Sequence, residues 1–241
     1  MKDQYTGDVN DYLKYSLLRV LLAAHPGALH VCWMLSAPDG RSDGRRLGYL
    51  DRQDGFAELD PEAFRALAEM VRGGRRSVAA VQEAGLLERA SFHAALLTDD
   101  GDARRGYFAN LWSVLGARDL VFFDPDNGLE VASVRFGKRN SCKYLYWEEL
   151  DRALGGQRSV CVYQHFPRVK RSAYVQRRLH DFKERFPRHA AFAVSSPSVA
   201  HLVCGRRAQV RELRRAAAEL SARSAGRLAV QELESGPLRR A

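Results

Sequence analysis

The sequence contains few cysteines and no long apolar run. Its four cysteines are scattered singly, without a Cys-x-x-Cys pair, so neither a zinc site nor a disulfide framework is expected. No stretch approaches the roughly 18 consecutive apolar residues that a transmembrane helix needs. The first residues, MKDQYTGDVNDY, are polar and lack the apolar centre of a signal peptide. We therefore expect a cytoplasmic protein with no membrane partner.

Positive charge is plentiful but unevenly distributed. Residues 168 to 241 hold 17 Lys and Arg against 6 Asp and Glu, whereas residues 1 to 167 hold 21 against 23. A basic part on a nearly neutral body favours a polyanionic partner, most often nucleic acid. A phosphate-bearing small molecule is the alternative, and an arginine- and alanine-rich sequence can also reflect only a GC-rich genome.

Apolar runs alternate with helical patterns along the chain. The runs at 29–35, 91–97, 119–124 and 159–166 predict buried strands, and HAAFAVSS and SVAHLVCG predict a late antiparallel pair. Helices are predicted at 8–24, 60–72, 75–84, 103–116, 148–154, 169–186 and 206–222. This alternation is typical of a mostly parallel sheet with helices on both faces. We predict one Rossmann-like α/β domain, a three-layer sandwich over residues 1–235 with a basic part at 168–235 and a loose tail at 236–241.

Polar side chains follow the clearest strands at the point where each one ends. Asp124-Pro125-Asp126-Asn127 lies at the end of the strand at 119–124. Ser36 to Asp43 follow the strand at 29–35, and Gln164, His165 and Arg168 lie at the end of the strand at 159–166. Ligands of such sheets bind outside the carboxyl ends of the strands, so these clusters predict one site. The alternative is a plain tight turn, because Asp, Asn, Pro and Gly all favour turns. At a rim with little counter-charge, Asp124 and Asp126 are expected to repel each other.

Asp124-Pro125-Asp126-Asn127 resembles the Asp-Pro-Pro-aromatic motif of methyltransferases that act on exocyclic base nitrogens. The N-terminal stretch from Gly7 to Lys14, with Asp8 and Asp11 between them, resembles the first helix of the large-subunit ribosomal RNA adenine-N6 branch of that family. The family's Gly-x-Gly cofactor turn is absent, and Ser36-Ala37-Pro38-Asp39 stands near that place.

The resemblance implies an S-adenosylmethionine-dependent methyltransferase that acts on a base amine in nucleic acid. It implies that Asp124, Asp126 and Asn127 orient the reacting amine. The residues expected to bind the cofactor are Asp8, Asp11, Lys14, Ser36 and Asp39. The residues expected to contact substrate are Glu130, His165 and Arg168.

Two other functions fit the same residues. Five carboxylates could face one cleft and hold Mg²⁺ or Mn²⁺ in a nuclease or phosphodiesterase: Asp39, Asp43, Asp124, Asp126 and Glu130. Lys143, His165 and Arg168 would then bind a phosphate. A nucleic-acid-binding protein without catalytic activity would have the same sequence features.

Overall fold

The computed structural model describes residues 1–37, 44–51 and 55–234. Within them, seven strands form one sheet in the order β2-β1-β3-β6-β8-β7-β9. These strands are β1 (Leu29–Cys32), β2 (Ala90–His93), β3 (Leu120–Phe123), β6 (Ser159–His165), β7 (His189–Ser195), β8 (Val199–Arg206) and β9 (Ala229–Glu232). β2, β1, β3 and β6 are parallel, whereas β8 is antiparallel to β6 and β7, and β9 is antiparallel to β7. The predicted α/β sheet is confirmed, with more antiparallel pairing than expected.

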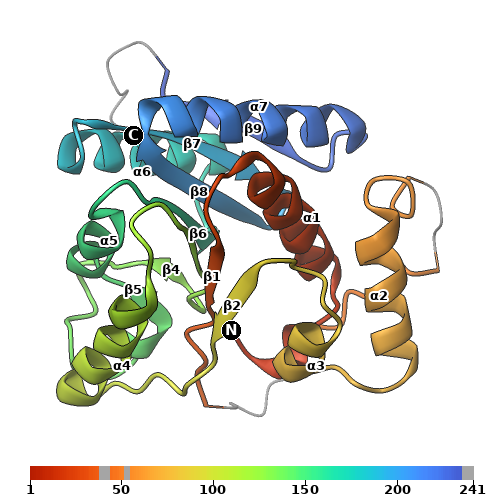
Figure 1. Ribbon diagram of the computed structural model, residues 1–241, viewed down its shortest axis with the longest axis horizontal. Helices are drawn as coiled ribbons and strands as arrows, with labels where there is room; N and C mark the ends of the chain where they lie inside the picture. The colour runs from red at the N-terminus through yellow and green to blue at the C-terminus, as the bar shows by residue number, and fades with distance from the viewer. Residues whose placement is uncertain (38–43, 52–54, 235–241) are drawn as a thin grey trace.

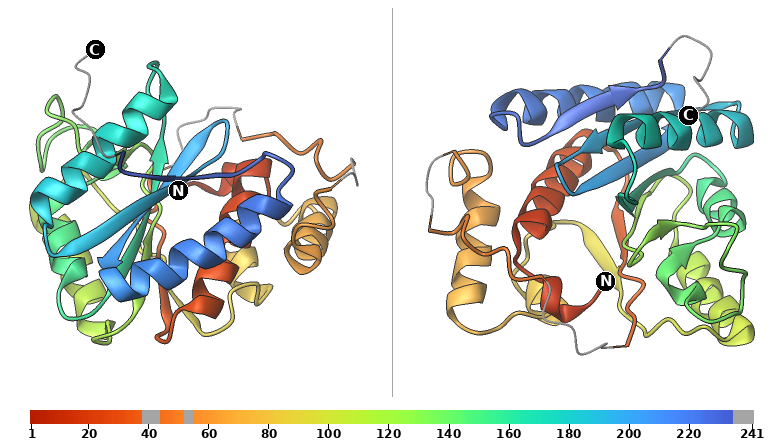
Figure 2. Two further views of the ribbon diagram at one scale, coloured as in Figure 1. Left: turned by 90° about the horizontal axis from the view of Figure 1, so that it is seen from above. Right: turned by 180° about the vertical axis from the view of Figure 1, so that it is seen from behind.

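Helices cover both faces of this sheet. They are α1 (Val9–Ala24), α2 (Pro61–Arg72), α3 (Val78–Glu83), α4 (Gly101–Val114), α5 (Trp147–Leu154), α6 (Arg171–Arg185) and α7 (Arg207–Arg223). Figure 1 shows α4, α5 and α6 on one side of the sheet and α1, α2 and α3 on the other. α7 packs beside α1, as the two views of Figure 2 show. No helix of the described residues is both long enough and apolar enough to cross a membrane.

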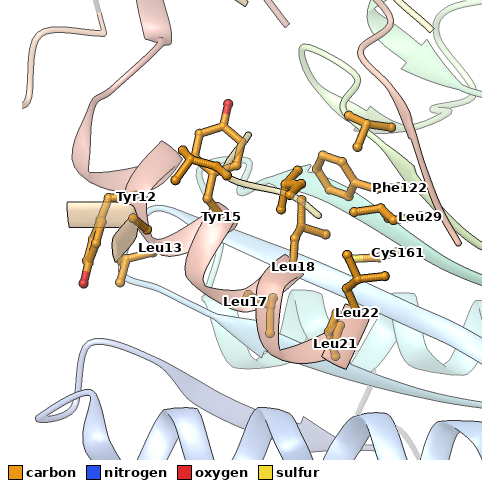
Figure 3. Close-up of a cluster of buried hydrophobic side chains, with 14 of the residues drawn as sticks. Tyr12, Leu13, Tyr15, Leu17, Leu18, Leu21, Leu22, Leu29, Phe122 and Cys161 are labelled. Atoms are coloured by element: carbon orange, nitrogen blue, oxygen red, sulfur yellow. The ribbon is translucent and has the colours of Figure 1, made fainter. Parts of the chain in front are cut away.

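Alternate residues of each central strand enter two separate cores. In β3, Phe122 packs with the leucines of α1, while Phe123 packs with residues of α4 and α5. Figure 3 shows the first of these cores, in which Leu18 and Leu22 of α1 point towards Leu29 and Phe122. A strand that is buried on both faces must be apolar throughout, which explains the continuous run in the sequence.

Local sequence signals set several helix ends. Asp60 caps α2 by accepting a hydrogen bond from the backbone N–H of Ala63 at 3.1 Å, and Pro61 is the first residue of this helix. α5 begins at Trp147, one residue earlier than predicted. β1 and β2 are shorter than their apolar runs.

Three short or edge strands were missed by the sequence analysis. β9 lies at one edge of the main sheet, and β4 (Gly128–Leu129) pairs in parallel with β5 (Tyr144–Leu145) in a second sheet. Two residues are too few for a periodic pattern, and the edge strand AVQE is half polar. The tail predicted at 236–241 lies outside the described residues.

Candidate active site

A polar cavity of about 830 Å³ lies at the carboxyl ends of β3 and β6. Its walls come from the N-terminal segment, the first turns of α1, the Asp-Pro-Asp-Asn segment and the chain between β6 and α6. Eight of the predicted site residues line it: Asp8, Asp11, Lys14, Asp124, Asp126, Asn127, His165 and Arg168. Ser36 adjoins it through a hydrogen bond to Asp126. Glu130 lines a neighbouring cavity, and Asp39 and Asp43 lie outside the described residues.

The N-terminal motif forms the start of α1. The Asp8 side chain caps the helix by accepting from the backbone N–H groups of Asn10 at 2.8 Å and Asp11 at 3.0 Å. Gly7 has a positive φ of 80°, and a Cβ there would meet the Val71 side chain at 2.7 Å. The Gly7 N–H donates to the Asp11 carboxylate at 3.0 Å. The motif therefore fixes a turn that aims Asp11 into the protein.

Lys14 is a buried cation that links the two motifs of the sequence. Its Nζ lies 2.6 Å from Asp11 Oδ1 and 2.8 Å from Asp124 Oδ2, and its side chain is 1% exposed. Burial disfavours the charged ammonium, but Asp11 and Asp124 outweigh burial and raise the pKa of Lys14. The rings of Tyr15, Trp33 and Tyr163 surround it, with centroids 4.9 to 5.7 Å from Nζ.

One cation thus faces two buried carboxylates. Burial raises the pKa of Asp11 to about 6, although Lys14 acts in the opposite direction and Asp8 adds to the rise. Burial also raises the pKa of Asp8. Such perturbed carboxylates beside a cavity are common at functional sites.

Asp126 binds groups that are remote in sequence. Its carboxylate accepts from Ser36 Oγ at 2.6 Å, and lies 3.0 Å from the Met1 ammonium and 3.5 Å from Lys2 Nζ. Burial raises the pKa of Asp126, but the nearby cations and Ser36 outweigh burial and hold the pKa below its usual value. The expectation of little counter-charge at Asp124 and Asp126 is wrong, because Asp124 is bound by Lys14, which it shares with Asp11, and Asp126 is bound by the ammonium groups of Met1 and Lys2. The tight-turn reading is also disfavoured, since these carboxylates bind distant groups rather than the local backbone.

The rest of the motif is held rigidly by β6. The Asn127 carbonyl accepts from the Gln164 side chain at 3.0 Å and from the His165 N–H at 3.3 Å. Gly128 has a φ of 113°, and a Cβ there would overlap the Gln164 side chain at 2.2 Å. These contacts leave the Asn127 side chain at the cavity wall without a hydrogen bond to any described residue. Its amide is therefore available to a ligand.

A basic rim surrounds the cavity. It consists of Arg46, Lys143, Arg168, Lys170 and Arg171. Among the described residues, none of these five side chains forms an ion pair. His165 lines the same wall, where desolvation lowers the pKa of its ring, while Asp124 and Asp126 act in the opposite direction. The wall therefore places an imidazole with a lowered pKa beside cations that form no ion pair with the described residues.

The proposed metal ligands do not come together in the described part of the chain. No group of three or more His, Cys, Asp or Glu residues there could hold a metal ion. Asp124 and Asp126 are engaged by ammonium groups, and Glu130 lines the second cavity.

The sequence analysis missed one residue of the site and one buried histidine beside it. Met1 contributes its ammonium group, which donates to the backbone carbonyl of Asp124 at 2.9 Å. His201 on β8 does not line the cavity but packs against Tyr163, which does, at 5.3 Å between ring centroids. It is fully buried, and neither of its ring nitrogens forms a hydrogen bond with a described residue. The only sequence signal for His201 is that it is a polar residue within an otherwise apolar strand.

Comparison with models of known protein families finds no match, and a search of curated proteins finds no relative.

Proposed function

We propose that this chain is an S-adenosylmethionine-dependent methyltransferase that acts on a base amine in nucleic acid. The carrying observation is the contact between Lys14 and Asp124, 110 positions apart in sequence and 2.8 Å apart in space. The two motifs that carry the resemblance therefore form one site. The strand order, with a reversed strand β8 beside β6, agrees with the Rossmann-like fold that the resemblance implies.

The site suits the ammonium end of the proposed cofactor. The backbone carbonyls of Met34 and Asp124 and the carboxylate of Asp126 already bind an alkylammonium group, that of Met1. The cofactor's ammonium would replace it on the same acceptors. Met34 has a positive φ of 45°, so the chain turns sharply after β1 without the family's glycines.

The chain's own residues would align the substrate. When bound, the cofactor supplies an electrophilic methyl group, and transfer to an amine then needs mainly orientation. The Asn127 side chain, which forms no hydrogen bond with a described residue, can accept a hydrogen bond from the amine. Lys14 holds Asp124 in place and balances its charge, and the basic rim can bind the phosphates beside the target base.

Transfer of a tritiated methyl group from S-adenosylmethionine to total RNA and to unmethylated DNA tests this function. We expect incorporation into one of these polymers and its loss in Asn127→Ala, which removes the side-chain amide without removing a buried charge. Leu96→Ala, at an exposed position outside both cavities, is the matched control. No incorporation into either polymer, with a rise in melting temperature on addition of Mn²⁺, would favour the hydrolase instead.

A further inference from the structure

A second cavity of about 1130 Å³ adjoins the candidate active site. The two cavities share Asn127, His165, Phe166 and Pro167 in their walls. The second one lies between α6 and the chain that runs from β4 to α5. A ligand in the first cavity can therefore continue into the second one past His165 and Phe166.

Aromatic side chains line this second cavity. They are Phe136, Tyr144, Tyr146, Trp147, Phe166 and Tyr174. Phe136 is 36% exposed and the neighbouring Val131 is 37% exposed, although large apolar side chains are otherwise mostly buried in the described chain. The Phe136 ring packs edge-to-face on Tyr146 at 5.3 Å between centroids, and Arg104 and Arg105 each lie 5.7 Å from its centroid. The exposed part of the ring can still contact a flat ligand.

Arginines alternate with these rings. Arg185 lies 4.7 Å from the Trp147 centroid, and Arg178 lies 5.5 Å from the Tyr174 centroid. Arg135 and Arg177 are exposed and form no ion pair with the described residues.

Acidic residues in the same wall are partly neutralised. Glu149 is bound by Arg104, and Asp181 is bound by Arg178. Burial also raises the pKa of Glu130, so this carboxylate takes up a proton and loses its charge at a higher pH than usual. The charge that would repel an anion is therefore smaller than the number of carboxylates suggests.

We propose that the two cavities form one groove for a single strand of nucleic acid, with the aromatic cavity stacking a base beside the one in the active site. The basic rim of the first cavity would bind the phosphates. Aromatic rings interleaved with cations are the usual means of holding unpaired bases, because every base has a face that stacks. A duplex hides those faces, so it would fit the groove poorly. The statement that this single strand is the substrate rests on the proposed function. The statement that the groove binds a single strand does not.

Fluorescence anisotropy with a labelled oligothymidine of about 12 nucleotides tests the groove without cofactor or turnover. Phe136→Leu keeps the apolar bulk and removes the ring. We expect it to weaken binding by about 5- to 160-fold, which corresponds to the roughly 1–3 kcal/mol of one stacked base. Phe136→Tyr should keep the affinity, and Leu96→Ala is the control for an exposed apolar position outside the groove.

The basic rim requires a second pair of variants. Arg168→Ala should weaken binding and flatten the dependence of log Kd on log salt by about 0.7, the value for one phosphate of a single strand. Arg211→Ala, at an exposed position on α7 outside both cavities, should change neither quantity.

Several outcomes would overturn the groove. Unchanged affinity in Phe136→Leu would exclude stacking there, and equal affinity for a blunt duplex would exclude selection of single strands. Equally tight binding of polyglutamate would point to an acidic protein partner. If Phe136→Leu loses binding while no methyl transfer is ever detected, the groove stands and the proposed methyltransferase function fails. If methyl transfer is detected and Phe136→Leu does not affect it, the methyltransferase function stands and the groove fails.

Discussion

Two buried cations on opposite faces of the sheet differ in how their charge is balanced. Arg104 on α4 is fully buried, binds Glu149 through two bonds of 2.6 and 2.8 Å, and donates to the carbonyls of Ser141 and Tyr144. Lys14 on α1 faces Asp11 and Asp124 and adjoins a cavity. The arginine network pairs one cation with one carboxylate, whereas the lysine network carries an excess negative charge.

This difference separates a structural contact from a functional one. A balanced buried pair with satisfied donors clamps α4 to the start of α5 and needs no ligand. An excess carboxylate costs stability when it is ionised, and proteins keep such a cost mainly at functional sites. The Lys14 network is therefore the stronger candidate for chemistry.

The largest expected effect is on the balanced pair. Arg104→Met leaves the Glu149 carboxylate buried without its partner, and should lower the free energy of unfolding by about 3–5 kcal/mol. Urea denaturation measures it. Arg211→Met, which removes an exposed arginine on α7, should change stability by less than about 0.5 kcal/mol. A loss below about 1 kcal/mol in Arg104→Met would mean that Glu149 is solvated after all.

The unbalanced network should respond to pH. The pKa of Asp11 is about 6 in the folded protein, against an ordinary value of 3.8. The native state therefore holds a proton that the unfolded state releases, so the stability from Asp11 is present below about pH 4 and lost as pH rises through 6. Relative to Asp11→Asn, the wild type should lose up to about 3 kcal/mol between pH 4 and 8.

Urea midpoints of both proteins across this range measure the difference, in which other titrating groups largely cancel. A constant difference between the two proteins would show that Asp11 titrates near its ordinary value.

A smaller effect concerns the second carboxylate of the Asp-Pro-Asp segment. Asp126→Asn removes a charge that binds Lys2 and Ser36, so it should lower the free energy of unfolding by about 1–2 kcal/mol at pH 7. The depressed pKa of Asp126 implies that this stability is present above about pH 4 and lost as pH falls further. Unchanged or raised stability in denaturant would restore the view that Asp124 and Asp126 repel each other.

The smallest effect on stability is expected at the groove. Arg177→Glu changes an exposed side chain and should alter the free energy of unfolding by less than about 0.5 kcal/mol, because it forms no ion pair with the described residues. Its affinity for single-stranded nucleic acid should fall and depend less on salt. Arg211→Glu adds the same charge outside the groove. Equal losses in both variants would indicate a general charge effect.

The sequence predicted those parts of the molecule that depend on local signals. The Asp60-Pro61 start of α2 needs only a capping side chain and a fixed φ. β3 and β6 need only continuous apolar runs, because both of their faces are buried. The half-polar edge strand β9 depends on pairing with β7, which lies far away in sequence. Such pairing leaves no periodic signal in a short segment.

Eight of the predicted site residues line one cavity, but the ion pairs that they form were not predicted. Because ligands of parallel sheets bind at the carboxyl ends of the strands, Asp124, Asp126 and His165 were predicted to lie at one edge of the sheet. The partners of those carboxylates come from the N-terminal segment, and nothing local in the sequence indicates that Lys14 and Lys2 reach them. For this reason the expectation of little counter-charge at these carboxylates was wrong.

Calorimetric titration with S-adenosylhomocysteine, the proposed product of the cofactor, tests the central claim most directly. We expect one binding event per chain in the wild type. We expect weaker binding in Asp126→Asn, which removes the negative charge from one of the acceptors proposed for the cofactor's ammonium, and unchanged binding in Leu96→Ala. Absence of binding to the folded wild type at any accessible concentration would contradict the proposal that the Lys14 and Asp124 motifs form a methyl-donor site.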